Sequence, residues 1–582
     1  MGAGGASTPT STTLSGTASA GAPIVGTVTI KDISSPAKDK TVTIAADGKY
    51  TIDVSNLTAP FMMRADGQVG GRSYSLYSAA ASADIGGTVN ITPLTDLIVA
   101  NIAGQVAATV YSSGNFSGIT TAALNQAETV LQQRLQPLLS AVGLDASIDL
   151  LRATFNTNHS GLDAALDVLR VTVDPITFQA TIQNVINNQQ IVDDLASQAD
   201  VTVIDTAGVA TGLTEFRQIV AKFNAWSALF ATSLPAHDNA ALLALFNGTN
   251  FLDSGENLTA FLSKITTFQR LIGAKFTNVT LESLTPIDAP TSAVVSFSVL
   301  AADGTELCND CRGWKMNKVG GVWLIAGDQR IARAGVGTFA RKEFTGAIDT
   351  GVSMEIRDEG GRGIDYAIVK GKGLPTTTGG ANGTSAGTLL VNFTSNNSFR
   401  LAQSGTAYNG INTLSITSGH NQFPMLDAAI SQFGENEVYT VEFWDDATTP
   451  SNLADDTRLA SYSDLVGKRP YFNSELSAAS FPTITTTPAA IQTFAAAGGN
   501  LTVTWTLPAG LRSSELHFFR NGGCTSTGCV SSNNDMVNID VVATATSATL
   551  TIGAPTFTVQ GSGINLSASD VFNRELVVEL GQ

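Results

Sequence analysis

The chain has 582 residues, and single hydrophobic cores stop growing at roughly 250–300 residues, so several domains are required. Hydrophobic residues make up 43% of the chain, which excludes wholesale disorder, whereas charged residues make up only 14% and 55 residues are glycine. The net charge of −17 and the lack of a Lys/Arg cluster argue against nucleic acid and anionic membrane surfaces as partners. The low share of charged residues together with many glycines indicates solvated β-surfaces and turns.

The N-terminal residues, 1–12, are rich in Gly, Ser and Thr, which predicts a flexible linker. They lack the charged and apolar regions of a signal peptide. The chain contains no run of 18 or more apolar residues, so no membrane span is predicted. Such linkers resemble those that follow the lipidated cysteine of proteobacterial-type lipoproteins. The resemblance implies an exported protein that reaches the membrane only through a lipid anchor absent from this chain.

Residues 13–92 alternate apolar and polar side chains between turns, which predicts a β-sandwich. Asp47-Gly48 lies between the runs 41–44 and 50–54 and favours a β-hairpin there. The stretches GAPIVGTVTIKD and DGKY resemble the carboxypeptidase-regulatory or transthyretin-like β-sandwich. That resemblance implies a spacer or binding module rather than a catalyst.

Residues 93–205 change to a period of 3.6 residues, which predicts a small helical domain. The stripe that carries the second half of this prediction consists of Leu162, Ala165, Leu166 and Leu169. Apolar stripes of this kind indicate core packing far more often than a cofactor site.

Residues 206–334 place helices before consecutive strands, an order that predicts an α+β domain. A long helix is expected over 215–234, with Asp238 as the N-cap of a second helix. The closing stretch GWKMNKVGGVWLIAGDQR resembles the last hairpin of the nuclear-transport-factor-two-like (cystatin-like) cone. That superfamily is functionally mixed, so the fold does not select a function. A pocket in this cone would be lined by Phe216, Phe223 and Trp226.

Residues 335–485 return to β-rich sequence and predict a further β-sandwich, with a clear alternating strand at 438–444. In residues 486–582, the stretch NLTVTWTLPAGLRSSELHFFR resembles a fibronectin type III-like sandwich, with Trp505 as its expected core tryptophan. The predicted fold class is therefore multidomain and mainly β, with Ig-like β-sandwiches, one small helical domain and one α+β domain.

The four cysteines form two close pairs, Cys308 with Cys311 and Cys524 with Cys529. Close pairing favours two structural disulfides and an oxidising compartment. A zinc site made from all four thiolates is the alternative. A thioredoxin-like redox motif is disfavoured, because 306–314 predicts a turn between strands rather than a helix start.

Catalytic motifs are weakly represented, and no catalytic residue is assigned. Residues 383–387 match the G-x-S-x-G nucleophile elbow, but a strand rather than a helix is expected after them. The four histidines include no metal-binding pair at i, i+4. His237-Asp238 is the best dyad, although Asp238 is better explained as a helix cap.

One acidic loop is a candidate Ca²⁺ site, because this ion binds six to eight oxygen ligands. The carboxylates are Asp445, Asp446, Asp455 and Asp456. A solvated acidic loop without an ion is the favoured alternative, and no other cofactor is expected. Trp444, just before the loop, is a candidate surface aromatic by strand alternation.

These features together predict a non-catalytic modular protein at the cell surface, the outer membrane or outside the cell. Its expected role is structural display or adhesion, with other envelope proteins, itself or extracellular polysaccharide as partners. The first alternative is a ligand-binding or accessory lipoprotein that uses the cone cavity. The second is a hydrolase.

Overall fold

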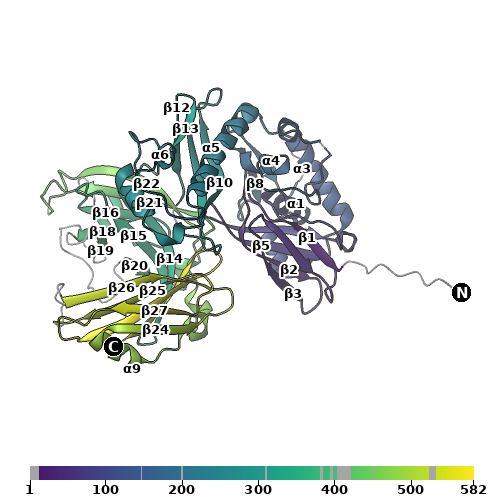
Figure 1. The fold of residues 1–582 in the computed structure, drawn as a ribbon. Coiled ribbons are helices and arrows are strands. Elements are labelled where there is room, and N and C mark those ends of the chain that lie inside the picture. Colours follow the sequence, from purple (N-terminus) through teal and green to yellow (C-terminus); the bar gives the residue numbers. More distant parts are fainter. Residues whose placement is uncertain are drawn as a thin grey trace. The chain divides into compact units, whose positions relative to one another are not determined.

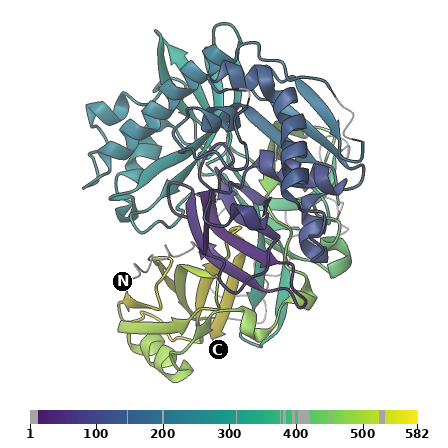
Figure 2. The same ribbon diagram turned by 90° about the vertical axis from the view of Figure 1, so that its right-hand side faces the viewer.

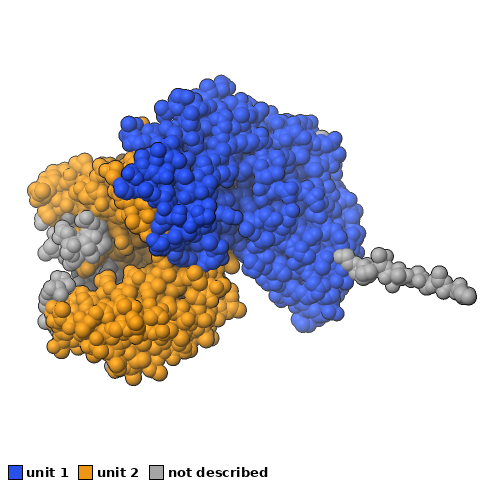
Figure 3. Space-filling view, viewed as in Figure 1, with its two compact units in different colours: residues 1–249, 269–327 blue, residues 250–268, 328–582 orange. Residues whose placement is uncertain are grey.

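The structure is a computed structural model that describes residues 12–145, 147–197, 201–308, 311–375, 377–379, 385–393, 398–402, 421–450, 452–523 and 533–581. These residues form two compact units, one made of residues 1–249 and 269–327 and the other of 250–268 and 328–582 (Figure 3). Strands make up 40% of the structure and helices 20%. The predicted mainly β, multidomain fold class is therefore confirmed.

The first unit begins with a β-sandwich. The strands are β1 (Thr13–Thr17), β2 (Val25–Asp32), β3 (Asp39–Thr43), β4 (Lys49–Asp53), β5 (Phe61–Val69) and β6 (Arg72–Ala80). One sheet has the order β3-β2-β5-β6 and the other pairs β1 with β4. The hairpin predicted at Asp47-Gly48 is therefore wrong: β3 and β4 belong to different sheets, and the turn between them carries the chain across the core.

Helices follow the sandwich in the same unit. They are α1 (Pro93–Ala103), α2 (Ala107–Ser113), α3 (Thr121–Ala141) and α4 (Leu162–Val168). Helix α1 packs against β6 and α3, as the blue helices beside the purple strands show (Figures 1 and 2). Among the described residues no single helix is long and apolar enough to span a membrane, although the bent pair α1–α2 meets both criteria together.

The predicted helical domain also contains an antiparallel sheet, which corrects that prediction for residues 169–194. Its strands are β7 (Leu169–Val173), β8 (Gln179–Asn184) and β9 (Gln190–Asp194). The first three residues of the predicted apolar stripe lie in α4, and the last, Leu169, begins β7, because α4 stops at Val168. A turn at Asp174, whose carboxylate accepts from the backbone N of Ile176 at 2.7 Å, then reverses the chain.

The α+β part of the first unit places helices before consecutive strands, as the sequence predicted. Its elements are α5 (Val209–Leu229), α6 (Ala240–Leu243), β10 (Lys275–Thr285), β11 (Ser292–Leu300), β12 (Trp314–Val319) and β13 (Val322–Gly327). The sheet is an antiparallel meander in the order β10-β11-β12-β13, with α5 packed on it. The predicted cap is wrong: Asn239, not Asp238, caps α6 by accepting from the backbone N of Ala241 at 2.9 Å.

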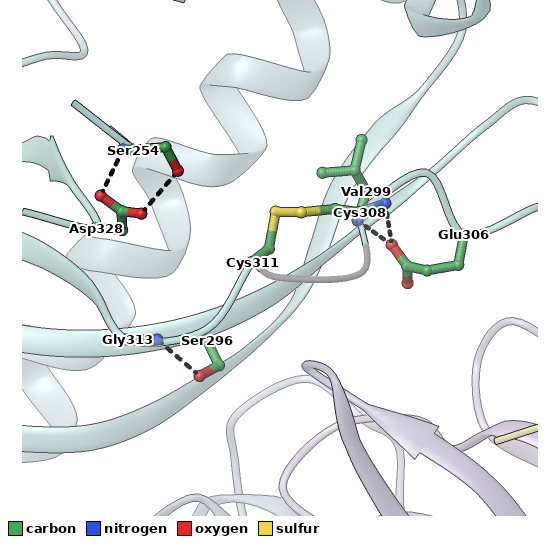
Figure 4. Close-up of a disulfide and its surroundings, with 8 residues drawn as sticks. All are labelled: Ser254, Ser296, Val299, Glu306, Cys308, Cys311, Gly313 and Asp328. Atoms are coloured by element: carbon green, nitrogen blue, oxygen red, sulfur yellow. Dashed lines mark hydrogen bonds between the residues drawn. A yellow bond between two sulfur atoms is a disulfide. The ribbon is translucent and has the colours of Figure 1, made fainter. Parts of the chain in front are cut away.

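A disulfide joins Cys308 to Cys311 in the connection between β11 and β12, as predicted. Figure 4 shows Glu306 beside it, accepting hydrogen bonds from the backbone N of Val299 at 2.8 Å and of Cys308 at 3.2 Å. Because both thiols are oxidised, this pair contributes no ligands to the alternative zinc site. Cys524 and Cys529 lie outside the described residues.

The second unit is dominated by one long sheet in the order β22-β21-β16-β18-β19-β15-β14-β29-β28-β25-β26. Two further strands join it, β17 paired with β18 and β20 paired with β15. Its strands are β14 (Arg333–Lys342), β15 (Ile348–Arg357), β16 (Tyr366–Lys370), β17 (Thr377–Gly379), β18 (Ser385–Phe393), β19 (Ser398–Leu401), β20 (Gln422–Pro424), β21 (Glu437–Asp445), β22 (Thr457–Val466), β25 (Arg512–Asn521), β26 (Asn534–Asp540), β28 (Gly561–Ser569) and β29 (Glu575–Gly581). The parallel pair β14–β29 joins the regions predicted as separate sandwiches, 335–485 and 486–582.

A smaller sheet in this unit has the order β23-β24-β27, formed by β23 (Thr483–Ile484), β24 (Gly499–Thr506) and β27 (Ser547–Ile552). Trp505 of β24 is 2% exposed inside a core cluster, as its predicted role requires. The unit's helices are α7 (Leu258–Ile265), α8 (Asp427–Ile430) and α9 (Pro488–Ala497). Helix α7 therefore folds with the second unit, although the sequence grouped it with the α+β domain.

Candidate functional site

The acidic loop connects β21 to β22, and strand pairing gives it a partner from far away in the sequence. Strand β16 pairs with β21 so that Tyr366 lies opposite Trp444. The backbone N of Asp365 donates to the carbonyl of Trp444 at 3.0 Å, which places Asp365 beside the start of the loop. The loop therefore has a carboxylate neighbour that comes from another strand.

Three carboxylates meet at this point, those of Asp365, Asp445 and Asp446, with ligand-capable oxygens all within 4.8 Å of one another. We call these three residues the acidic loop site. The backbone N of Asp446 donates to Asp365 Oδ2 at 2.9 Å, which couples the two segments directly. Asp445 Oδ1 accepts from the backbone N of Ala447 at 2.8 Å, and Asp445 Oδ2 takes no part in this bond.

The remaining two predicted ligands, Asp455 and Asp456, are not in that group of three. Asp455 is exposed and accepts from the hydroxyl of Thr449 at 2.8 Å. Asp456 is 6% exposed; its Oδ2 accepts from the Tyr366 hydroxyl, and its Oδ1 is buried without a hydrogen-bond partner. The structure thus separates the four predicted carboxylates into one close pair, one buried neighbour and one exposed residue.

Electrostatic repulsion accumulates in this loop. Burial, together with the charges of Asp446 and Asp445, raises the pKa of Asp365 to about 6, against the lowering effect of the Asp446 hydrogen bond. Burial and the neighbouring loop carboxylates also raise the pKa of Asp456. A bound cation would remove this repulsion, because it favours the ionised form of every carboxylate around it.

The nearby basic side chains bind a different carboxylate. Lys370 lies 2.9 Å and Arg458 3.3 Å from Glu442 Oε1, and Glu442 lies inside β21 with 4% of its surface exposed. The all-carboxylate composition of the acidic loop site matches the hard oxygen ligands that Ca²⁺ prefers. Three carboxylates leave the rest of the six to eight positions to backbone carbonyls and water.

Trp444 does not form the surface aromatic that strand alternation suggested. It is 5% exposed and stacks on Tyr366, with ring centroids 6.1 Å apart and planes 5° apart. Leu453 of the acidic loop packs against the same cluster. The loop covers the face of β21 that carries Trp444. Alternation assigns this face to solvent, but in the structure it forms a second core.

The serine of the G-x-S-x-G match lies in a strand. Ser385 begins β18, and its hydroxyl donates to Glu442 rather than to a histidine. Gly383, Thr384 and His420 lie outside the described residues. A nucleophile elbow needs a helix directly after the serine, and β18 takes that place, so this match is not an elbow. His237 and Asp238 are both exposed.

Phe216, Phe223 and Trp226, the predicted pocket lining, lie in the core of the α+β part and are at most 1% exposed. Trp226 stacks on Phe276 with ring centroids 3.8 Å apart, and the ring centroids of Phe223 and Phe297 are 4.7 Å apart. These rings pack directly against one another and so occupy the space that a ligand would need. The contacts therefore favour a packed core at these residues, and a ligand pocket remains only a prediction from the sequence.

Asp365 is the functional candidate that the sequence alone does not reveal. It is a single carboxylate ahead of an ordinary strand, and its partner Asp446 is 81 residues further on. The only local signal is its place at the start of a buried strand, next to a position that pairs with another strand. Strand order in the sheet is needed to connect it with the loop.

No family model matches this chain, and no curated protein matches it. A tetra-tandem repeat in the extending region of a large adhesion protein is similar at 10% identity, covering 98% of each chain, with a TM-score of 0.13. The FN1–FN3 domains of chicken CNTN1 are 8% identical over 53% of this chain and 98% of theirs, with a TM-score of 0.13. A Ca²⁺-stabilised adhesin with which an Antarctic bacterium binds ice is 10% identical over 99% of this chain and 98% of its own, with a TM-score of 0.11. Scores this low carry no argument, so the site must be interpreted from its own geometry.

Proposed function

We propose that this chain is a non-catalytic, modular protein that acts outside the cell in adhesion or structural display, and that Ca²⁺ binds at its acidic loop site. The observation that carries the proposal is the meeting of three carboxylates, Asp365, Asp445 and Asp446, within 4.8 Å at the pairing of β16 with β21. An ion there would tie the loop to the sheet.

The location outside the cell is supported by two features. The Cys308–Cys311 disulfide fits an oxidising compartment. Calcium sites of extracellular modules work at about 10⁻⁴–10⁻³ M, an affinity that suits a loop in which Asp365 and Asp445 are still partly exposed. Attachment through a lipid anchor stays part of the proposal without further support.

The non-catalytic role is supported by the hydrogen bonds of Ser385, the serine of the G-x-S-x-G match, and of the basic residues near it. Ser385 and the basic residues Lys370 and Arg458 all bind Glu442, which makes a structural network inside the sheet. Loops between the strands of such sheets are the usual places for binding partners. The expected partners are other envelope proteins, extracellular polysaccharide or a second copy of this chain.

Calcium titration of the chelator-treated protein tests the ion site. We expect 1 mM Ca²⁺ to raise the melting temperature of the second unit, and Asp365→Asn to abolish this rise. The amide keeps an oxygen that accepts from Asp446, so loss of the calcium response reports loss of charge rather than loss of the fold. Asp455→Asn is the matched control and should respond like the wild type. An equal response in Asp365→Asn, or none in the wild type, would contradict the site.

Binding assays test the adhesion role. The full chain, with and without 1 mM Ca²⁺, is tested for retention on whole cells and on extracellular polysaccharide and for self-association in sedimentation. Calcium-dependent retention or self-association supports the proposal. A monomer that binds neither cells, polysaccharide nor itself under both conditions contradicts it, whether or not the ion binds.

A further inference from the structure

A second group of metal-capable side chains lies in the first unit, on helix α4 and in the turn before it. It consists of His159, Asp163 and Asp167, and we call it the His159 cluster. Their ligand-capable atoms all lie within 4.8 Å of one another. Residues four apart share one face of a helix, so Asp163 and Asp167 point to the same side of α4. His159 lies in the turn before the helix, where its side chain meets them.

The hydrogen bonds of the cluster leave one buried oxygen without a partner. The backbone N of His159 donates to Asp163 Oδ2 at 2.7 Å, and His159 Nδ1 lies 3.0 and 3.1 Å from the two oxygens of Asp167. Asp163 is 0% exposed, and its second oxygen, Oδ1, has no hydrogen-bond partner. Buried carboxylate oxygens are costly unless they are paired or bind a metal ion, so this oxygen is available as a ligand for a cation.

His159 is held in place by contacts with helix α5 and by its own backbone conformation. Its carbonyl accepts from Arg217 Nε at 3.0 Å and Nη2 at 2.9 Å, and its ring meets the ring of Phe216 edge-on with centroids 5.2 Å apart. Its backbone adopts a φ of 59°, a left-handed conformation that is uncommon for residues other than glycine. Such fixing of a ligand by surrounding contacts is what a metal site requires, because it reduces the cost of ordering when the ion binds.

We propose that the His159 cluster binds a divalent transition-metal ion of the Zn²⁺ type, with one imidazole and two carboxylates as protein ligands. The imidazole distinguishes it from a calcium site, because nitrogen ligands suit Zn²⁺ and its neighbours in the transition series whereas Ca²⁺ takes oxygen. Water completes the coordination, as it does in sites with three protein ligands.

The present spacing is close to what such an ion needs. Two ligands at about 2.1 Å from a tetrahedral ion are about 3.4 Å apart. His159 Nδ1 and the nearer oxygen of Asp167 are 3.0 Å apart, so a small separation of the two side chains admits the ion between them. The imidazole side chain keeps 19% of its surface exposed, which gives the ion a path from solvent.

The ion also supplies the charge that the cluster lacks. Burial raises the pKa of both Asp163 and Asp167, with the charge of Asp167 adding to the effect on Asp163. The charges of His159 and Arg217 lower the pKa of Asp167, and His159 lowers that of Asp163, yet both pKa values stay raised; a divalent ion would add to these cations. This makes the cluster different from an ordinary His–Asp ion pair, which would need only His159 and Asp167.

Zinc calorimetry and the visible absorption of Co²⁺ test the proposal on the full chain. All proteins carry Asp365→Asn, which removes the acidic loop site as a competitor. We expect Asp163→Asn and His159→Gln each to weaken Zn²⁺ binding at least tenfold and to remove the absorption of bound Co²⁺. Asp288→Asn and His237→Gln, which change exposed residues of the same unit, are the matched controls and should bind like the parent protein.

Three results would overturn the proposal: no Zn²⁺ binding by the parent protein at millimolar concentration, equal affinity in the parent and in Asp163→Asn, or loss of binding in His237→Gln alone. Should Asp163→Asn fail to fold by circular dichroism, His159→Gln carries the test, because its ring is at the rim of the cluster. The acidic loop site is absent from every protein used, so failure here leaves the calcium proposal untouched.

Discussion

The His159 cluster and the acidic loop site are both groups of three metal-capable side chains, but different parts of the chain build them. In the His159 cluster the outermost ligands are only 8 residues apart, with His159 in the turn before α4 and Asp167 near the end of that short helix. In the acidic loop site Asp365 and Asp446 are 81 residues apart and meet through strand pairing. Helical spacing can therefore bring ligands together locally, whereas a sheet does so only when its strand order is known.

Burial and ligand type also differ between the two groups. Asp163 and Asp167 are buried beside an imidazole, while the acidic loop site has carboxylates alone, two of them partly exposed. Buried charges depend more strongly on a counter-ion than exposed charges, because water screens the latter. The two sites should therefore differ both in the preferred metal and in how much stability the ion adds.

The largest expected effect separates the two ions in one calorimetric experiment. At a hundred times its dissociation constant, a ligand that binds only the folded state adds about 2.7 kcal/mol to the free energy of unfolding. We expect a gain of this size from Zn²⁺ that Asp163→Asn lowers by about 1.3 kcal/mol or more and Asp365→Asn leaves intact. For Ca²⁺ we expect a gain that Asp365→Asn abolishes and Asp163→Asn leaves intact. Each variant is the other's control. A single variant that abolished both gains would show that the two groups are not independent sites.

A second effect concerns the metal-free protein. Asp163→Asn should raise the free energy of unfolding above pH 7 by about 1–2 kcal/mol, because the amide removes a buried charge next to Asp167. Asp365→Asn should raise it less, since Asp365 is only partly buried. Chemical denaturation in the presence of a chelator measures both. Destabilisation by Asp163→Asn would mean that its carboxylate already has an adequate partner in the metal-free protein.

Glu128 provides a buried carboxylate outside both groups, and with it a test by pH. It lies on α3, and its Oε1 accepts from the backbone N of Leu150 and Leu151. Burial, helped by the charge of Asp149, raises the pKa of Glu128 from 4.5 to about 7. The folded protein therefore binds more protons than the unfolded chain between these values, so its stability falls as pH rises through this window.

Glu128→Gln should flatten that fall. The difference in slope between wild type and variant should not exceed about 1.4 kcal/mol per pH unit, the limit for one proton. Urea unfolding from pH 4.5 to pH 7.5 measures it, and Asp288→Asn serves as the exposed control. Identical slopes in the wild type and Glu128→Gln would show that Glu128 does not titrate in this range.

The smallest expected effect distinguishes two possible ligand sets for calcium. Asp455→Asn should change the free energy of unfolding by less than about 0.5 kcal/mol, because Asp455 is exposed and its known partner is the Thr449 hydroxyl. Its calcium affinity should stay within twofold of the wild type in calorimetry. A tenfold loss would restore the set of four loop carboxylates that the sequence predicts.

The sequence was informative about both candidate sites only where their geometry is local. Asp445 and Asp446 lie where β21 ends, and this position next to a loop could be predicted from alternation in the strand. The step of four residues from Asp163 to Asp167 is also visible in the sequence, but the cluster has one imidazole and so lacks the pattern of a metal-binding histidine pair. The place of Asp365 at the start of a buried strand does not reveal its role, because that role depends on the pairing of β16 with β21.

By itself, the sequence determined the mainly β class, the strands of the β10–β13 meander, the Cys308–Cys311 disulfide and the buried Trp505. These follow from alternation, turn residues and close spacing, which act over a few residues. Tertiary structure decided that β3 and β4 lie in different sheets, that β14 pairs with β29, and that Asp365 meets Asp446. Pairing partners are chosen by burial of whole faces against each other, and that free energy belongs to the assembled sheet rather than to any one segment.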